Sequence, residues 1–445
     1  MSASSIKTVP IDRHAAFDKR KLFILSVIAL VTAGVSFGLR GSIATDLQTT
    51  FFDPIDRLRS AEMVGSVLSV AFLGFAFTIA IGSPLLDYIG MGRLLTLSSV
   101  CFIAGTLVVV FAGSLASGAA TYNVIWTGMV LIGIGQGLVE TVINPLTTTL
   151  YPEEKTARLN ILHAWWPAGI IIGSLSGLFI GQLNMNWQVK FSMVLIPAVT
   201  FGVLCLFAKF PPTERVASGI PTSDTFKEVS RPFFIVWFLA MFLTAASELA
   251  PGQWVDLALT RTVGMQGIWL LIYVSGLMFV MRHFAGPMVH KLSPVGLLWT
   301  SSLLASAGLL LLSVANSPLT GLLAATVWGT GVCYMWPTML AAASERFPRG
   351  GALLMGLMGT AGTLSIYFVL PLMGKIFDNA KIAAAGGKEA FERLTGDELN
   401  RVLAIASQTS FRYVAILPAV LLVVFGAIWL YDRSRGGYKP TRIGG

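Results

Sequence analysis

The segment that joins the second and third apolar runs of the chain reads GSPLLDYIGMGR, from Gly82 to Arg93. A shorter counterpart, GPMVHKL, follows the eighth apolar run, from Gly286 to Leu292. Both segments contain glycine and proline, the residues that most often end helices and form turns. His290 in the second segment takes the place that Asp87 has in the first. The recurrence of one turn at corresponding places predicts a chain built from two similar halves.

The composition places most of the chain in lipid. Of the 445 residues, 55% are hydrophobic and only 12% are charged, whereas soluble chains carry about 25% charged residues. So few charges cannot cover a water-exposed surface of this size, which excludes soluble enzymes, nucleic-acid readers and disordered scaffolds. The three cysteines lie in apolar runs with no partner at metal-ligand spacing, so we expect neither a metal site nor a disulfide framework.

Twelve apolar runs have the roughly 17–25 residues needed to cross the hydrocarbon of a bilayer. They lie at about 22–45, 62–84, 93–113, 122–150, 157–181, 189–209, 232–255, 266–289, 294–314, 318–344, 350–376 and 410–431. We therefore expect an all-α membrane protein whose twelve transmembrane helices form two pseudo-symmetric six-helix bundles.

The net charge of +9 is explained by membrane topology. Most Lys and Arg residues fall in the two tails and in the loops of one side, Arg282 among them, and positive charge marks the cytoplasmic side. We expect a multi-pass protein of the plasma membrane, a bacterial inner membrane, with both termini cytoplasmic. Its expected partners are the lipid bilayer and a small solute rather than nucleic acid, and we expect a monomer.

Polar segments divide the chain. We predict a cytoplasmic N-terminal tail, a first six-helix bundle, a cytoplasmic linker, a second six-helix bundle with an extracytoplasmic insertion, and a cytoplasmic C-terminal tail. These parts cover residues 1–21, 22–209, 210–231, 232–431 with the insertion at 377–408, and 432–445.

Ionisable residues inside spans are costly and therefore mark functional sites. They are Arg40 in span one, Glu140 in span four, His163 in span five and Glu248 in span seven. Span ten adds a polar and aromatic group made of Tyr334, Trp336 and Thr338. Spans one, four, seven and ten are every third helix, as expected if three-helix units line one central cavity.

Span four carries a polar stripe, because Gln136, Glu140 and Asn144 are spaced four residues apart and share a helix face. Glu140 can bind a solute hydroxyl, carry a coupled proton, or do both. A purely structural Glu140, bonded to a neighbouring helix, is the competing interpretation. Span five continues the polar surface with Asn160 and His163, three residues apart. It also offers Trp165 or Trp166 as a flat face for a sugar ring, and a packing or interfacial tryptophan is the competing interpretation.

Span seven contains Pro251 and Gly252, three and four residues after Glu248, and we expect this pair to break the helix, with Gln253 and Trp254 beside the unwound part. Arg40 lies at nearly the same depth in span one. Because an unpaired charge would be costly there, we expect Arg40 and Glu248 to interact. The pair can act as a structural lock, as a proton-sensitive gate, or as an anion-binding arginine with its acidic partner.

The loop from Gly82 to Arg93 resembles the G-x-x-x-D-x-x-G-x-[RK] loop of the major facilitator superfamily. That resemblance implies a conformational latch made by Asp87 and Arg93 at the cytoplasmic side.

A narrower resemblance follows from spans four, five, seven and ten. The motifs ETVINP from Glu140 to Pro145, RLN from Arg158 to Asn160, Trp336-Pro337-Thr338, and Glu248 with the GQW at 252–254 are similar to motifs of the fucose–galactose–glucose:proton symporter family. The resemblance implies a sugar substrate, with Glu140 in proton coupling or sugar binding and the two asparagines of spans four and five as hydroxyl partners.

The sequence departs from that family in span one, where Leu39-Arg40-Gly41-Ser42 replaces an Asn-Asp pair. A cation there raises the case for an acidic sugar or another organic anion. His163 and Trp166 also stand where glutamine and asparagine are common.

We therefore expect a secondary active transporter rather than an enzyme, a symporter of a sugar or sugar derivative that works by alternating access. No nucleotide loop and no cofactor is expected. The coupling ion is expected to be the proton, with sodium as the alternative, and Glu140, Glu248, Arg40 and His163 are the candidates for coupling or gating. The other functions considered are an organic-anion carrier, an exporter of amphipathic compounds, and a membrane sensor or enzyme; the last would require a larger domain outside the membrane.

Overall fold

A computed structural model describes residues 17–151, 155–211, 227–260, 263–282, 285–347 and 351–439. Within these ranges every regular element is helical, as lipid requires, because only helices or closed barrels satisfy all backbone hydrogen bonds without water. The all-α architecture expected from the sequence is confirmed.

Within the described residues up to 211, the chain forms eleven helices. They are α1 (Lys19–Ser42), α2 (Ala44–Leu47), η1 (Gln48–Phe52), α3 (Asp53–Asp56), α4 (Ser60–Ile89), α5 (Met91–Val110), α6 (Ala112–Leu115), α7 (Ala119–Leu150), α8 (Lys155–Gln182), α9 (Trp187–Ser192) and α10 (Leu195–Phe207). Asp18 caps α1 by accepting the backbone N–H of Lys21, and this bond lowers the pKa of the Asp18 carboxyl. We call this set the N-terminal helices.

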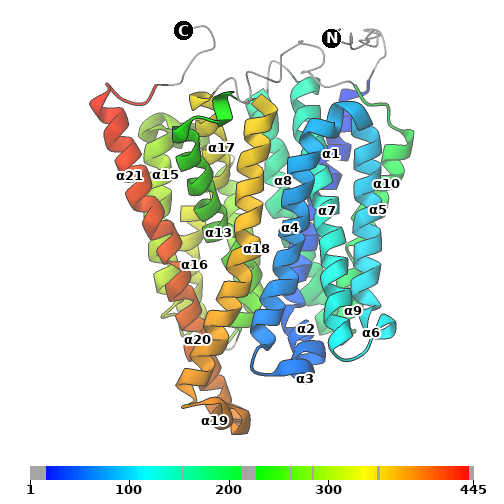
Figure 1. The fold of residues 1–445 in the computed structure, drawn as a ribbon, viewed down its shortest axis with the longest axis vertical. Helices are drawn as coiled ribbons and strands as arrows, with labels where there is room; N and C mark the ends of the chain where they lie inside the picture. Colours follow the sequence, from blue (N-terminus) through cyan, green and yellow to red (C-terminus); the bar gives the residue numbers. More distant parts are fainter. Residues whose placement is uncertain are drawn as a thin grey trace, which may run out of the picture.

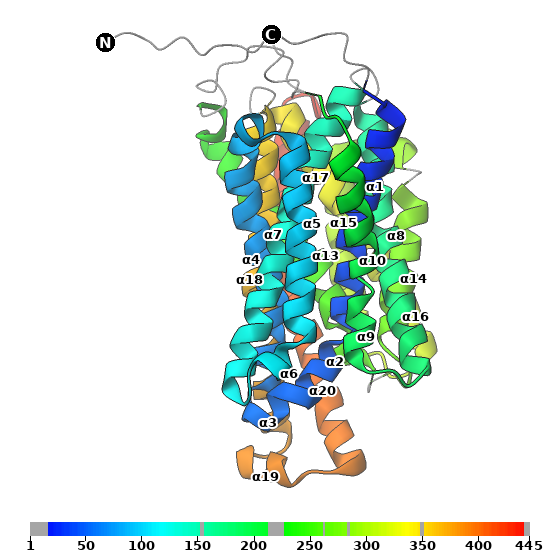
Figure 2. The same cartoon turned by 90° about the vertical axis from the view of Figure 1, so that its right-hand side faces the viewer.

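The second half contributes the C-terminal helices. They are α13 (Pro232–Leu259), α14 (Ile268–Arg282), α15 (Ala285–Leu312), α16 (Pro318–Val332), α17 (Met335–Arg346), α18 (Gly351–Ala384), α19 (Lys388–Arg393), α20 (Gly396–Val414) and α21 (Ile416–Ser434). The two sets lie side by side, with the start of α1 and the end of α21 at one end of the molecule and α19 at the other (Figures 1 and 2). We call these the terminal end and the insertion end.

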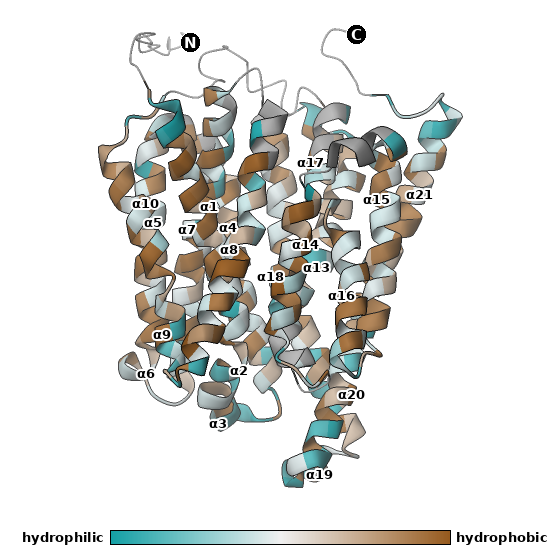
Figure 3. Cartoon of the chain, turned by 180° about the vertical axis from the view of Figure 1, so that it is seen from behind, coloured by the Kyte–Doolittle hydropathy of each residue, from teal (hydrophilic) through white to brown (hydrophobic). Residues whose placement is uncertain are grey.

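Ten helices of the described residues are long and apolar enough to cross a membrane. Of the remaining expected spans, span eight is the shorter apolar helix α14, and span ten is divided into α16 and α17. Hydrophobic residues are frequent along the helices between the two ends (Figure 3), and many large ones are exposed, as a lipid-facing surface requires. The structure is therefore consistent with twelve spans, and the division into two six-helix bundles remains a prediction.

The repeated turn is sharper than the sequence indicates. Helix α4 continues through the first half of the GSPLLDYIGMGR segment, and the chain turns at Gly90 alone, with φ of 92°. In the second copy the corresponding turn is Ser293, with φ of 62°, inside the span assigned to α15. Each copy therefore reverses direction through a single residue with positive φ, and in the first copy that residue is the glycine best suited to it.

Close packing depends on glycines in spans two, four and five. A Cβ built on Gly133 of α7 would lie 1.9 Å from the carbonyl oxygen of Ala71 in α4. A Cβ on Gly173 of α8 would lie 2.4 Å from the carbonyl oxygen of Val35 in α1. Small residues let helix backbones approach each other closely in membranes, so the glycine-rich segments are explained by packing.

Helix α13 does not break at Pro251, contrary to the expectation from the sequence. Proline removes the N–H that would bond the carbonyl four residues earlier, which is the carbonyl of Ser247. The indole N–H of Trp328 in α16 donates to that oxygen at 3.1 Å. A side chain from a neighbouring helix therefore satisfies the freed group, and the helix stays continuous.

The predicted insertion is largely helical. Its first residues continue α18 to Ala384, and the expected short surface helix is α19. Helix α20 then leads back toward the membrane. The predicted linker lies mostly outside the described residues.

We predict that Gly133→Ala lowers the stability of the folded protein, because the added methyl must push α4 away from α7. Overpacking of this kind costs about 1–3 kcal/mol. The measurement is the thermal unfolding midpoint in detergent. Gly276→Ala in α14 is the matched control, since a Cβ there meets nothing within 4 Å; an equal midpoint shift in both variants would contradict the prediction.

Candidate functional site

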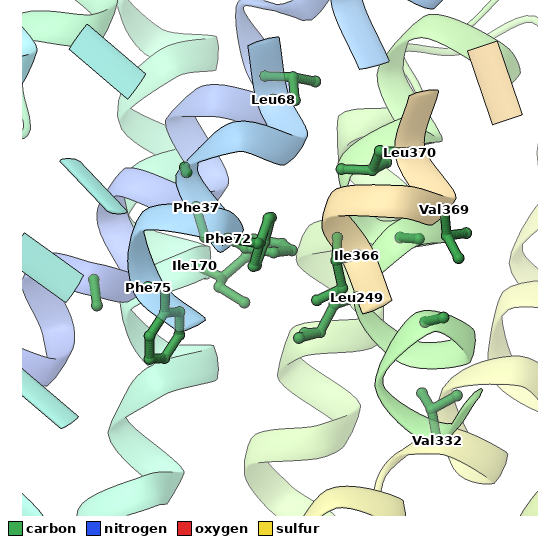
Figure 4. Packing of buried hydrophobic residues seen from close by; sticks show 14 of the residues in the cluster. Phe37, Leu68, Phe72, Phe75, Ile170, Leu249, Val332, Ile366, Val369 and Leu370 are labelled. Carbon is green, nitrogen blue, oxygen red and sulfur yellow. The ribbon is translucent and has the colours of Figure 1, made fainter. Parts of the chain in front are cut away.

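A small cavity of about 50 Å³ lies between the N-terminal and C-terminal helices. The N-terminal helices contribute Phe72, Phe75, Gln136, Glu140, His163 and Trp166, and the C-terminal helices contribute Glu248, Leu249, Arg282, Trp336 and Thr363. Figure 4 shows part of the surrounding apolar packing, with Phe72 and Phe75 on α4 and Leu249 on α13. Six of the residues that the sequence singled out as solute-binding candidates therefore surround one space.

The polar stripe of α7 forms a chain of hydrogen bonds to α8. The side-chain amide of Asn144 donates to Glu140 Oε2 at 2.9 Å, one helical turn away. The carbonyl oxygen of the same amide lies 2.9 Å from Nε2 of His163. When His163 carries its proton on Nε2, Asn144 both accepts from the imidazole and donates to the carboxylate. Asn144 therefore orients the two titratable groups of the N-terminal helices that face the cavity.

The second acidic group of the cavity is paired within the C-terminal helices. Nη2 of Arg282, at the end of α14, lies 3.2 Å from Glu248 Oε1. The side chains are only 10% and 4% exposed. The other carboxylate oxygen of Glu248 is buried and has no hydrogen-bond partner among the described residues. This free oxygen is available to a hydrogen-bond donor entering the cavity.

The predicted pair of Arg40 and Glu248 is wrong. Arg40 is fully buried, but its Nε contacts only the Ser36 carbonyl at 3.4 Å, and its two terminal nitrogens have no partner among the described residues. The guanidinium carbon lies 5.1 Å from the ring centre of Phe72 on α4. Similar depth along two helices does not fix the direction in which each side chain points, and Arg40 points toward α4.

Span seven meets span one through Gln253 instead. Its side-chain amide donates to the Phe37 carbonyl at 2.9 Å. Trp254 is fully buried against Phe377 of α18, with ring centres 6.2 Å apart. Neither residue lines the cavity, so both serve in packing in this conformation, although the sequence nominated them for binding.

Two of the three residues nominated in span ten also lie away from the cavity. The Tyr334 hydroxyl donates to the Met281 carbonyl at 3.0 Å, and Thr338 is buried without lining the space. Only Trp336 of this group reaches the cavity wall. Span ten is divided between Val332 and Met335, so the residues on either side of the division do not follow one helix face.

The side chains of Asn160 and Asp87 lie outside the described part of the structure. Arg93 is exposed, at the terminal end. The predicted latch between Asp87 and Arg93, and the solute contact of Asn160, therefore remain predictions.

Five residues of the cavity were not nominated from the sequence. Phe72, Phe75 and Leu249 are apolar residues in apolar spans, and Thr363 is one of several threonines in span eleven, so no local signal distinguishes them. Arg282 did carry a signal, because it is charged and lies within a run of apolar residues. It was assigned instead to the cytoplasmic rim, since its position near a span end fits the topology rule equally well.

The two sets of helices are joined at the insertion end. The Glu62 backbone N–H donates to Asp378 Oδ2 at 2.9 Å, and Lys381 Nζ donates to the Arg57 carbonyl at 3.0 Å. Lys381 and Asp378 themselves lie 2.5 Å apart and are both buried. These contacts close the insertion end in this conformation.

The cavity has room for only a few water molecules. It is therefore too narrow for a bound hexose without movement.

Comparison with known families places the chain among membrane carriers. The family model described as Major Facilitator Superfamily matches residues 20–369. Myo-inositol transporter 1 of Candida albicans is 23% identical over 45% of this chain and 35% of its own length. Solute carrier family 49 member A3 of Xenopus tropicalis is 24% identical over 48% of this chain and 44% of its own length. The chain thus spans less than half the length of these curated relatives.

Solved structures share the fold at low sequence identity. The xylose transporter from E. coli, in a partially occluded inward-open conformation, matches with a TM-score of 0.73 at 13% identity, over 92% of this chain and 97% of its own. The fucose:proton symporter of E. coli matches with a TM-score of 0.60 at 17% identity, over 91% of this chain and 98% of its own. At these identities the similarity establishes the fold alone.

We predict opposite effects for two buried arginines. Arg40→Met should leave the thermal midpoint unchanged or raise it, because a hydrophobic side chain of similar volume replaces an unpaired buried charge. Arg282→Met should lower it, by the equivalent of about 3–5 kcal/mol, because removal of one partner leaves a buried charge uncompensated. Thermal unfolding of both variants in the same detergent is the measurement. A loss of stability in Arg40→Met as large as in Arg282→Met would contradict the assignment.

Proposed function

Because the chain belongs to the major facilitator superfamily, we propose that it is a secondary active transporter that carries a sugar or sugar derivative together with protons across the plasma membrane. Transport proceeds by alternating access to the cavity between the N-terminal and C-terminal helices. The observation that carries the proposal is the hydrogen-bonding character of that cavity.

Two fully buried polar atoms of the cavity residues lack a partner within the described part of the chain, and both are acceptors. Glu248 Oε2 and Gln136 Oε1 are buried without a partner among the described residues. A buried acceptor left unpaired costs about 1–3 kcal/mol, so the cavity favours a ligand rich in hydroxyl donors. Trp166 and Trp336 add apolar faces from opposite sets of helices. Hydroxyl groups around an apolar ring are the chemistry of a sugar or cyclic polyol.

The charges of the cavity support coupling to protons. Glu140 and Glu248 carry two negative charges when ionised, and Arg282 supplies one positive charge. With a neutral imidazole on His163, the cavity then has one net negative charge. One added proton therefore neutralises the cavity and lowers the cost of enclosing it in a medium of low dielectric constant. Glu140 is the proposed proton carrier, because Arg282 already compensates Glu248, whereas only Asn144 bonds to the Glu140 carboxylate among the described residues. A sodium ion is the alternative coupling ion.

Alternating access requires the contacts at the insertion end to open. They include two hydrogen bonds to α18: the Glu62 N–H at the start of α4 donates to Asp378, and the Arg57 carbonyl, in the turn before α4, accepts from Lys381. Such hydrogen bonds can be exchanged for bonds to water when the end opens, which makes this closure reversible. We infer that the described conformation opens toward the terminal end, the proposed cytoplasmic side.

The names of the similar proteins agree with a hydroxylated solute. They include a xylose transporter, a fucose:proton symporter and a myo-inositol transporter.

The second candidate function is an organic-anion carrier, favoured by the unpaired guanidinium of Arg40. It requires Arg40 to reach the solute, whereas Phe72, one of the cavity walls, packs against Arg40 in this conformation. The efflux pump alnA of Emericella nidulans is also similar to this chain, and its name agrees with the alternative of an exporter.

We predict that neutral sugars or cyclic polyols stabilise the purified protein and that sugar acids do not. A ligand at a hundred-fold excess over its Kd stabilises by about 2.7 kcal/mol, which a thermal-shift assay resolves. The screen uses neutral hexoses, pentoses, inositol and the matching sugar acids at pH 5.5 and pH 7.5. Stabilisation by acids alone, lost in Arg40→Met, would replace the proposal with the organic-anion function.

We predict that Glu140→Gln abolishes accumulation of the solute driven by a pH gradient while exchange of internal for external solute continues. The amide keeps the shape and the hydrogen bond to Asn144 but cannot take up a proton. Radiolabelled solute in proteoliposomes measures both activities. Glu398→Gln, on the exposed surface of α20, is the matched control. Accumulation that persists in Glu140→Gln would remove Glu140 from the coupling mechanism.

A further inference from the structure

Span ten is interrupted beside the cavity. Helix α16 ends at Val332 and α17 begins at Met335, with Cys333 and Tyr334 between them. The last carbonyl groups of a helix have no partner within that helix, so an interruption in a membrane span needs donors from elsewhere. Trp336, on the first turn of α17, lines the cavity. The interruption therefore lies next to the place where a solute would bind.

Helix α14 supplies the bonds at this interruption. Nε of Arg282 donates to the Cys333 carbonyl at 3.2 Å. In the reverse direction, the hydroxyl of Tyr334 donates to the Met281 carbonyl at 3.0 Å. The last turn of α14 is thus bonded to both residues that separate α16 from α17.

The Arg282 side chain also donates a second hydrogen bond. While Nε holds the backbone of span ten, Nη2 holds Glu248 Oε1 of α13 at 3.2 Å. The planar guanidinium fixes the directions of both donors. The strength of this link depends on the charge of Glu248, since a hydrogen bond to an ionised partner is roughly twice as strong as a neutral one.

We propose that Arg282 is a positioning residue that couples the charge of Glu248 to the interruption of span ten. When Glu248 takes up a second proton, beyond the one proposed for Glu140, or when a solute donor occupies its free Oε2, the carboxylate holds Arg282 less firmly. The Arg282 bond to the Cys333 carbonyl then weakens, and α17 can move relative to α16. This inference rests on the proposed function of the cavity as the transport site.

Other titratable groups lie near the pair of Arg282 and Glu248, and a test must distinguish their effects from that of Glu248. Glu140 of α7 and His163 of α8 line the same cavity, and Cys333 lies at the interruption itself. The arrangement assigns the coupling to Glu248, because among these groups the ion pair with Arg282 is formed by Glu248.

Cys333 provides a reporter of the interruption in the natural sequence. Its thiol is buried, as is that of Cys205, while Cys101 is partly exposed. Maleimide labelling of the full-length protein in detergent, resolved by peptide mass spectrometry, gives a rate for each cysteine. Each rate is divided by that of the same cysteine in denatured protein at the same pH, which removes the ordinary pH dependence of an exposed thiol.

The expected result for Glu248→Gln is a rise of about ten-fold in the normalised labelling of Cys333, the size that follows when a charge-assisted hydrogen bond becomes a neutral one about half as strong. Cys101 and Cys205 should not change. Arg282→Lys should give a similar rise, since one ammonium group cannot reproduce the two fixed donors, and the double variant should add little to either. Asp46→Asn, which removes the acid of the ion pair between Lys190 and Asp46, is the control and should leave Cys333 unchanged.

The pH dependence separates a coupling role from a structural one. In the unsubstituted protein the normalised labelling of Cys333 should fall as pH rises, because Glu248 becomes ionised and holds Arg282 more firmly. Glu248→Gln should remove this slope and Glu140→Gln should keep it. Unchanged Cys333 labelling in Glu248→Gln, a rise at all three cysteines, or a slope that only Glu140→Gln removes would each overturn the proposal. No solute is needed, so a failed ligand screen and a failed labelling test are distinguishable.

Discussion

The absence of water around and inside the helices is the constraint on which the rest of the structure depends. Every backbone group and every charge must find its partner within the protein. The freed carbonyl of Ser247 receives the Trp328 indole, and the interruption of span ten is bonded to α14. Glu248 is paired with Arg282 for the same reason. Among the buried polar atoms of the described residues that lack a partner, an oxygen of Glu248 and the terminal nitrogens of Arg40 belong to ionisable groups inside spans, so they are informative about function.

The cavity combines two polar systems that belong to different sets of helices. Glu140, Asn144 and His163 form one connected chain on the N-terminal helices. Glu248 and Arg282 form the other on the C-terminal helices. A solute between them would bond to both, so its binding would link the movements of the two sets. Under the proposed function, proton uptake and solute binding would favour the same closed arrangement without direct contact between Glu140 and Glu248.

Much of the architecture was predictable because it follows from local pattern. Apolar runs of sufficient length predicted the spans, and the spacing of Gln136, Glu140 and Asn144 predicted a shared face, which the bond between Asn144 and Glu140 requires. The break at Pro251 was predicted wrongly, because local rules do not include the indole that a distant helix supplies. Arg282 was misassigned because charge at a span end has the same pattern whether it lies at the membrane surface or points into a cavity.

The sequence by itself determined that the chain is a helical membrane protein, where its spans lie, and which spans carry the costly polar groups. Composition, span length and helical period act within a segment of chain, so no folded structure is needed to read them. Only the tertiary structure decided the partners: Arg282 rather than Arg40 for Glu248, Phe37 for Gln253, and Trp328 for the carbonyl freed by proline. Pairing depends on the rotation of each helix about its axis and on the neighbour it faces, and both are set by packing between segments far apart in the chain.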